Sequence, residues 1–292
     1  MKNYKVFILL TLCVLFWAGN FIFGSLVVTE LTPVGLTFIR WLFASIILFI
    51  VAQKVEKPNW KQVLTQWPKI LMLSLTGIIG YNLFLYYALY FTTPLNASLV
   101  NSLNPGLIAI ASAVYLRERI SKYHIVGIFI SLLGVFTVLT KGNLLQAFAI
   151  SYNKGDILII GAIIMWTVYS ILGKKLSVPT ITSTAVSGLM AAFILLPFVA
   201  ASKIDYAGMS TLSLMGVIYI ILFPSSISFV LWNIGVKEVG ASKAGVFLNL
   251  NPVFTAIISG VMGQSISLVQ LVGGLLVFIG VYITTATKGE QR

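Results

Sequence analysis

Two Asn-Pro pairs stand near the middle of apolar stretches that are each long enough to cross a membrane. They are Asn104-Pro105 and Asn251-Pro252, about half a chain apart. Proline removes a helical hydrogen bond and frees backbone carbonyls about one turn earlier. These carbonyls could bind an ammonium group, or the breaks could act as hinges; we favour hinges, which need no ligand contact. Interrupted spans at corresponding positions of two halves indicate the binding site of a transporter.

Arg40 is the only charged residue well inside an apolar stretch. It lies about 10 Å along a helix from Pro33, at roughly 1.5 Å per residue. Burying such a charge at the centre of a span costs about 2.5–3.5 kcal/mol on insertion scales. Two interpretations stay open: Arg40 anchors a carboxylate or another anionic group of a ligand, or it bonds to helix ends as structural support.

Aromatic and amide side chains recur at helical spacing. Trp17 and Asn20 are three residues apart, as are Trp166 and Tyr169, so each pair shares one helix face. An aromatic surface with a hydrogen-bonding tip suits a cavity wall, whereas packing or an interfacial belt is the alternative. We favour the cavity because an amide surrounded by apolar residues, as Asn20 is, needs a partner.

Further polar side chains stand inside apolar stretches, and we add five of them to the candidate site: Tyr81, Asn82, Tyr86, Asn101 and Asn249. They favour an uncharged pocket for a zwitterion or a neutral solute, although some must serve as hydrogen bonds between helices. No Asp or Glu lies deep in an apolar stretch, and proton relays in membranes use such side chains. We therefore expect a facilitator or exchanger, with Asp156 as a weak candidate for proton coupling.

The composition places the chain in a lipid bilayer. Of its 292 residues 59% are hydrophobic and 9% are charged, against about 25% charged residues in soluble domains. The net charge of +12 is spread through loops and forms no stripe, so we exclude nucleic acid as a partner. The single cysteine, Cys13, excludes an intramolecular disulfide and a thiolate metal cluster. We expect neither a cofactor nor a metal.

Apolar runs bounded by charges or turn residues predict ten helical spans, at 6–28, 33–53, 70–91, 95–116, 123–141, 155–173, 180–201, 211–233, 244–263 and 268–286. The first run is too long for a cleaved signal peptide. With a cytoplasmic N-terminus, only Lys141, Lys154 and Lys203 lie outside and Arg40 lies within a span, which leaves 15 of the 19 Lys and Arg residues inside. This asymmetry follows the positive-inside rule and predicts that both termini are cytoplasmic.

The two halves of the chain resemble each other in sequence. The matched pairs are Phe16-Trp17 with Met165-Trp166, Gly24 with Gly173, the two Asn-Pro pairs, Ile120-Ser121 with Ile266-Ser267, Gly127 with Gly273 and Gly134 with Gly280. Five spans per half is an odd number, so the second copy would cross the membrane in the opposite direction. Inverted repeats are a transporter architecture with the site at the repeat interface, although a scaffold inherited by duplication is the alternative. We expect the repeats to cover 1–145 and 150–292.

Glycines seven residues apart mark the last predicted span of each half. They are Gly127 and Gly134 in the first half and Gly273 and Gly280 in the second. Glycine on one helix face lets two backbones approach closely. We expect these faces to pack in a helix pair or in a dimer seam.

The chain resembles the EamA-type permeases of the drug/metabolite transporter superfamily. The resemblance rests on the five-plus-five arrangement together with Phe16-Trp17-Ala18-Gly19-Asn20, Phe38-Ile39-Arg40-Trp41, Asn104-Pro105 and Arg117-Glu118-Arg119, and it covers nearly the whole chain. It implies ten helices around a central cavity and export or exchange of small metabolites, often amino acids. One departure is that the acidic residue expected after the fourth span of each repeat is Glu118 in the first half but Gln264 in the second.

We therefore expect an all-α protein of the bacterial plasma membrane, with ten spans forming two inverted five-helix repeats around a central cavity, as a monomer or a homodimer. Its predicted partners are the lipid bilayer and a small organic metabolite, most readily an amino acid, moved by alternating access. A multidrug or toxic-cation exporter is the alternative, disfavoured because a cation needs an acidic counter-charge. A membrane enzyme would need clustered His, Asp or Cys, and a channel would need a continuous polar stripe.

Overall fold

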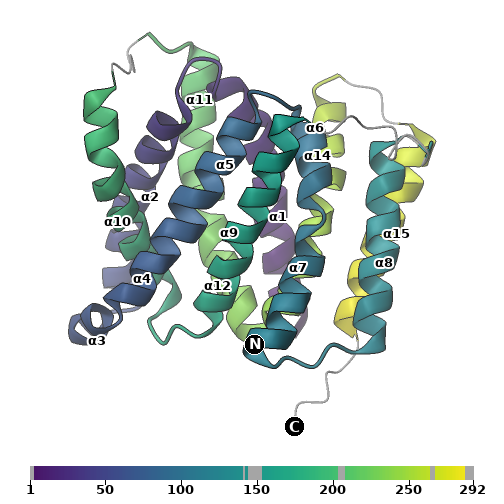
Figure 1. The fold of residues 1–292 in the computed structure, drawn as a ribbon, viewed down its shortest axis with the longest axis horizontal. Helices are drawn as coiled ribbons and strands as arrows, with labels where there is room; N and C mark the ends of the chain where they lie inside the picture. Colours follow the sequence, from purple (N-terminus) through teal and green to yellow (C-terminus); the bar gives the residue numbers. More distant parts are fainter. Residues whose placement is uncertain (1–2, 141, 144–152, 203–207, 264–266, 287–292) are drawn as a thin grey trace.

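The computed structural model describes residues 3–140, 142–143, 153–202, 208–263 and 267–286, and these residues form helices and no strand. Figure 1 shows the helices side by side, running between two opposite faces of the molecule. Several predictions fall outside the described residues: those on Lys141, Lys203, Gln264, the junction between the two proposed repeats, and the C-terminal tail.

Within the described residues, eight segments are long and apolar enough to cross a membrane. Four are continuous helices: α1 (Asn3–Val27), α2 (Pro33–Val55), α9 (Lys154–Lys174) and α10 (Thr180–Ala201). Four are built from shorter pieces: α4 (Trp67–Leu73), η1 (Ser74–Gly80) and α5 (Tyr81–Ala88); α6 (Pro94–Asn101), α7 (Asn104–Ala111) and η2 (Ser112–Leu116); α11 (Thr211–Ile220), η4 (Ile221–Ser228) and α12 (Phe229–Val239); α13 (Ala241–Val246), η5 (Phe247–Asn249) and α14 (Leu250–Val261). Two shorter apolar helices are α8 (Lys122–Leu139) and α15 (Leu268–Ala286).

Each predicted span overlaps one of these apolar segments, although several bounds differ by three residues or more. The third segment ends at Ala88 instead of residue 91, and the eighth continues to Val239 instead of residue 233. A short helix, α3 (Trp60–Thr65), lies in a stretch that we expected to be a loop. It begins there because the side chain of Asn59 accepts the backbone N–H of Lys61 and caps the helix.

Both Asn-Pro segments are interrupted at the turn before the proline. In the first, a turn at Ser102-Leu103 separates α6 from α7. In the second, the 3₁₀ turn η5 separates α13 from α14, one residue before Asn251-Pro252. The missing proline N–H leaves the helical ladder open at these places. The predicted discontinuities are therefore present in both segments.

Two other segments change from α to π geometry part-way along. They are η1, which begins at Ser74, and η4, which begins at Ile221, 147 residues later. Such π segments are often found at functional sites because they free backbone groups from the regular ladder. In η4 the freed carbonyls bind α1: Pro224 O accepts from Nε1 of Trp17 at 3.2 Å, and Ser228 O accepts from Sγ of Cys13 at 3.2 Å.

The predicted glycine faces form a helix pair inside the chain. In Figure 1, α8 and α15 stand together at one side of the molecule. A Cβ atom on Gly280 would lie 2.5 Å from the backbone N of Ser131, and one on Gly134 would lie 2.6 Å from the carbonyl oxygen of Gly273. These glycines thus pack between the last helices of the two halves, as the prediction of a helix pair expected.

Loop carboxylates of the first half cap helices of the second half. Glu30 accepts the backbone N–H of Ser210 at 2.8 Å. Glu56 accepts that of Thr182 at 2.8 Å, and Glu118 accepts that of Ala241 at 3.2 Å. A carboxylate is stabilised at a helix N-terminus by free N–H groups and by the helix dipole. The hydroxyl and N–H of Ser210 accordingly hold the pKa of the Glu30 carboxyl below its ordinary value. These three acids therefore stabilise contacts between the first half and the second half.

Candidate functional site

Aromatic rings from both halves meet in the interior of the molecule. The ring centroids of Trp17 and Trp166 lie 5.0 Å apart and nearly perpendicular, at 88°. Trp232 lies 5.5 Å from Trp17 and 5.4 Å from Trp166, and Phe229 lies 5.3 Å from Trp166. Trp17 and Trp166 come from corresponding positions of α1 and α9, and the structure brings them into contact. We call these four rings the aromatic cluster.

Two tyrosines extend the aromatic cluster on the side of Trp166. Tyr81 lies 5.0 Å from the Trp166 ring, and Tyr169 stacks on it at 5.0 Å. The indole Nε1 of Trp166 is buried and has no hydrogen-bond partner among the described residues. The cluster therefore contains one free N–H donor among apolar ring surfaces.

Arg40 is buried next to Trp41, whose ring contacts Phe229 of the aromatic cluster, and it bonds to neutral side chains from both halves. Its side chain is 1% exposed. Nε donates to Oγ of Ser225 in η4 at 2.8 Å. Nη1 donates to Oδ1 of Asn82 at 2.7 Å, to Oδ1 of Asn20 at 3.3 Å and to the hydroxyl of Tyr86. One guanidinium thus joins α1, α2, α5 and η4, so the structural interpretation of Arg40 has direct support.

The acceptors around Arg40 are held in place by bonds of their own. The Tyr86 hydroxyl donates to Oδ1 of Asn20 at 2.9 Å, and Nδ2 of Asn82 donates to the carbonyl of Ile78 in η1 at 2.6 Å. Each of these partners of Arg40 is uncharged. Because arginine stays protonated in proteins, its positive charge faces only neutral dipoles in the described part of the chain, and the anchor interpretation stays open beside the structural one.

The second half repeats this arrangement without a charge. Nδ2 of Asn233 donates to the Tyr169 hydroxyl at 2.7 Å and to Oγ1 of Thr184 at 3.1 Å. At the offset that relates the halves, Tyr169 corresponds to Asn20 and Asn233 corresponds to Tyr86. The amide and the phenol have therefore exchanged positions between the two halves while keeping their contact.

The position that corresponds to Arg40 in the second half is Ser187, 147 residues later. Its hydroxyl donates to the backbone carbonyl of Thr184 in its own helix, at 3.1 Å. The charge is therefore a property of the first half alone, and it makes the site asymmetric.

The remaining predicted residues lie at the helix interruptions. Asn101, Asn104, Asn249 and Asn251 are buried, and so are Pro105 and Pro252. Asn249 donates from Nδ2 to Oγ of Ser131 in α8 at 2.6 Å, and no contact of its side chain with the aromatic cluster is described. Its Oδ1 atom and that of Asn251 are buried without a partner among the described residues.

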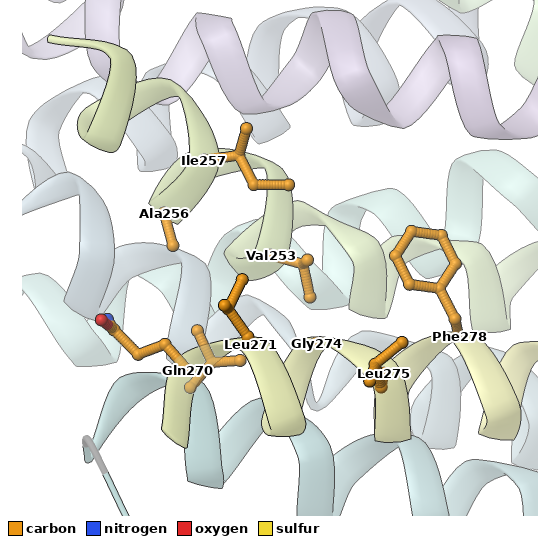
Figure 2. Close-up of a pocket in the computed structure, with 9 residues that line it drawn as sticks. Val253, Ala256, Ile257, Gln270, Leu271, Gly274, Leu275 and Phe278 are labelled. Carbon is orange, nitrogen blue, oxygen red and sulfur yellow. The ribbon is translucent and has the colours of Figure 1, made fainter. Parts of the chain in front are cut away.

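The rings that we expected to line a cavity touch one another, so the centre is packed in this conformation. One described pocket, of about 370 Å³, lies at the periphery instead. Figure 2 shows Val253, Ala256 and Ile257 of α14 facing Leu271 and Phe278 of α15 across it. None of the predicted site residues lines this pocket.

The candidate site chosen from the sequence lacked five residues that the structure places there, namely Thr184, Ser225, Phe229, Trp232 and Asn233. Hydroxyl groups are common in membrane helices because they bond to their own backbone, and one phenylalanine is not distinctive among many. The available signal was Pro224, since a proline inside a long apolar run predicts a disturbed helix, and Ser225 follows it directly.

Comparison with known proteins identifies the family. Residues 5–140 and 153–286 both match the EamA-like transporter family. The chain belongs to the EamA-like transporter family. The predicted resemblance is thus confirmed: this EamA protein is an all-helical, multi-pass membrane protein and a transporter, not an enzyme.

Relatives of this EamA protein cover nearly its whole length. Uncharacterized transporter YyaM of Bacillus subtilis is 29% identical over 96% of this chain and 93% of its own. A protein of Streptantibioticus cattleyicolor named "Probable terminal-alkyne amino-acid exporter" is 26% identical over 100% of this chain and 97% of its own. A solved crystal structure superposes with a TM-score of 0.79 at 21% identity and covers 97% of both chains, which shows a shared fold.

Proposed function

We propose that this EamA protein moves small organic metabolites, most readily amino acids, across the bacterial plasma membrane by alternating access. In this proposal residues 1–145 and 150–292 are two inverted five-helix repeats with ten spans, and both termini are cytoplasmic. The substrate binds between the repeats, where inverted-repeat transporters hold their substrates.

The observation that carries this proposal is the composition of the interior site. Corresponding positions of the two halves, Trp17 and Trp166, contact each other. The pairs Asn20–Tyr86 and Tyr169–Asn233 then flank them, one pair from each half. A buried site made of paired positions is what two related halves produce when they meet around a shared axis.

The interruptions supply the flexible points that alternating access needs. The packed aromatic cluster corresponds to a closed state. Bending at Asn104-Pro105 and Asn251-Pro252 would open it toward one face, because the helical ladder is already broken there. The π segments η1 and η4 lie next to the site, and their bonds to Asn82 and Trp17 can rearrange with it.

Two observations favour amino acids over the alternative of a multidrug or toxic-cation exporter. A full-length relative is named as an amino-acid exporter. In addition, the interior contains the buried cation of Arg40, and each described partner of that cation is neutral. A cationic drug would be repelled there, since in a low-dielectric interior like charges are screened weakly.

Counterflow in proteoliposomes tests the proposed function. Purified protein is reconstituted with a mixture of unlabelled amino acids inside, and the uptake of labelled amino acids is followed without a proton gradient. We expect the wild-type protein to take up the labelled amino acids. Trp166→Ala should abolish this uptake. Trp67→Ala should leave it intact, because Trp67 is 53% exposed. Counterflow of organic cations with none of amino acids would support the alternative exporter and overturn the proposal.

A further inference from the structure

On the basis of the transport function proposed above, we infer that the substrate is an organic carboxylate, and that its carboxylate binds between the guanidinium of Arg40 and the indole N–H of Trp166. The apolar part of the substrate then lies against the aromatic cluster. The inference starts from buried N–H donors, at and beside the aromatic cluster, that have no partner among the described residues.

Donors without matching acceptors gather around the aromatic cluster. Nε1 of Trp166 and Nε1 of Trp41 are both buried without a hydrogen-bond partner among the described residues. The Trp41 ring lies 4.6 Å from Phe229, and Phe229 lies 5.3 Å from Trp166. The Arg40 guanidinium lies 5.8 Å from the centroid of the Trp41 ring. A buried donor without a partner is unfavourable, so this region is complementary to a ligand that brings acceptor atoms.

The charge of Arg40 indicates that the acceptor atoms of the ligand are anionic. The described loop acids Glu30, Glu56 and Glu118 cap helix N-termini, and each described hydrogen-bond partner of Arg40 is neutral. An unmatched cation inside a membrane protein is unfavourable. A substrate carboxylate would neutralise it, and a bidentate pair of a carboxylate with arginine adds energy and geometric specificity.

The geometry of the guanidinium leaves an edge for this carboxylate. Three neutral oxygens share Nη1, Nε is bonded to Ser225, and Nη2 takes part in none of the four bonds. A carboxylate binds a guanidinium through two parallel bonds. It would use Nη2 together with Nη1 and displace the weakest of the neutral partners, which by distance is Asn20 at 3.3 Å.

Binding of the carboxylate would also loosen contacts that hold the helices of the site together. Arg40 links α2 to η4 through Ser225 and to α5 through Asn82 and Tyr86. A ligand that competes for the guanidinium weakens these links, and both η1 and η4 have π geometry that can rearrange. Ser187 stands at the equivalent position of the second half, so the site takes one carboxylate and not two.

A matched pair of probes tests this inference in proteoliposomes. L-phenylalanine and L-phenylalaninamide have the same apolar group and differ at the carboxylate. We expect counterflow of the acid with an apparent affinity about 10-fold or more above that of the amide, from the loss of a charge-assisted pair. Arg40→Gln should remove this preference by weakening the acid more than the amide.

A second pair of variants separates ligand binding from structural support. Trp166→Phe removes a donor that has no partner and leaves the bonds of Arg40 in place, so it should weaken the acid more than the amide. Trp232→Phe is the control, because Nε1 of Trp232 already donates to Oγ of Ser170 at 3.2 Å, and it should leave the preference intact.

The outcomes distinguish the inference from the proposed function. If wild-type protein carries acid and amide equally well, the carboxylate inference is overturned while transport stands. If it carries neither of these probes nor any other amino acid, the proposed function fails. If Arg40→Gln does not fold, the response of Trp166→Phe decides: an unchanged preference overturns the inference, and a reduced one supports it.

Discussion

Single residues distinguish the two halves at the site. In the first half the Tyr86 hydroxyl accepts from the charged Arg40 and donates to Asn20. In the second half the Tyr169 hydroxyl accepts from the neutral amide of Asn233. The two phenols are both buried, so they form a pair that differs in the charge of one partner and in the additional bond from Tyr86 to Asn20.

Removal of each hydroxyl should therefore have unequal effects on stability. Hydrogen bonds to charged groups contribute about 1.5–3 kcal/mol, against about 0.5–1.5 kcal/mol for neutral ones. We expect Tyr86→Phe to lower the free energy of unfolding by about 2 kcal/mol and Tyr169→Phe by about 1 kcal/mol. Denaturant unfolding in detergent, followed by circular dichroism, measures both. A larger loss in Tyr169→Phe would show that the charge of Arg40 adds nothing to its bond with Tyr86.

At the scale of helical elements, prolines act differently according to their place. Pro252 follows the 3₁₀ turn η5 in an interrupted segment, whereas Pro197 lies inside the continuous helix α10 with its side chain exposed. Alanine restores the missing N–H donor. At position 252 that donor would favour a continuous helix across the proposed hinge.

We expect Pro252→Ala to reduce the turnover rate of transport and to leave the binding affinity unchanged. Pro197→Ala is the control and should leave both unchanged. Initial rates of counterflow and a thermal-shift titration with the same amino acid measure the two quantities. A hinge role for Pro252 is refuted if both variants keep the wild-type turnover rate.

The glycine faces of α8 and α15 lead to a second prediction at the scale of helical elements. A Cβ atom at Gly280 would lie 2.5 Å from a backbone atom of the facing helix, while one at Gly106 in α7 meets nothing within 4 Å. Gly280→Ala should push the two helices apart and lower the unfolding temperature.

Gly106→Ala is the control for this variant. It should stabilise the protein by about 0.5–1 kcal/mol, because alanine favours a helix interior over glycine. Thermal unfolding of the two variants in one detergent measures the difference. Equal unfolding temperatures would mean that the close approach of α8 and α15 does not limit stability.

At the scale of the whole molecule, orientation in the membrane is the main prediction. The single native cysteine, Cys13, is buried, so it should not react with a membrane-impermeant maleimide. Gln62, in the short helix α3, and Thr29, in the turn after α1, are both exposed, and we predict that they lie on opposite faces of the membrane. On intact cells we expect labelling of Thr29→Cys and none of Gln62→Cys, which should react only after the membrane is opened. The reverse pattern would show that the predicted orientation is inverted.

The sequence could predict properties that depend on neighbouring residues along the chain. Apolarity over about 20 residues defines a span, and proline defines where a helix breaks, so the segments and the interruptions before Pro105 and Pro252 agree with the structure. Arg40 was identified for the same reason, because a charge inside an apolar run is visible without knowing what surrounds it. The family resemblance also came from motifs of this kind.

Only the tertiary structure decided which side chains meet. Ser225 bonds to Arg40 across 185 residues, and such a contact depends on how helices pack, which no local pattern specifies. The exchange of Asn and Tyr between the halves was hidden because matching by identity overlooks positions where the residues differ. The same holds for the packed aromatic cluster in place of an open cavity: ring positions follow from sequence spacing, but whether the rings touch depends on the distance between helices.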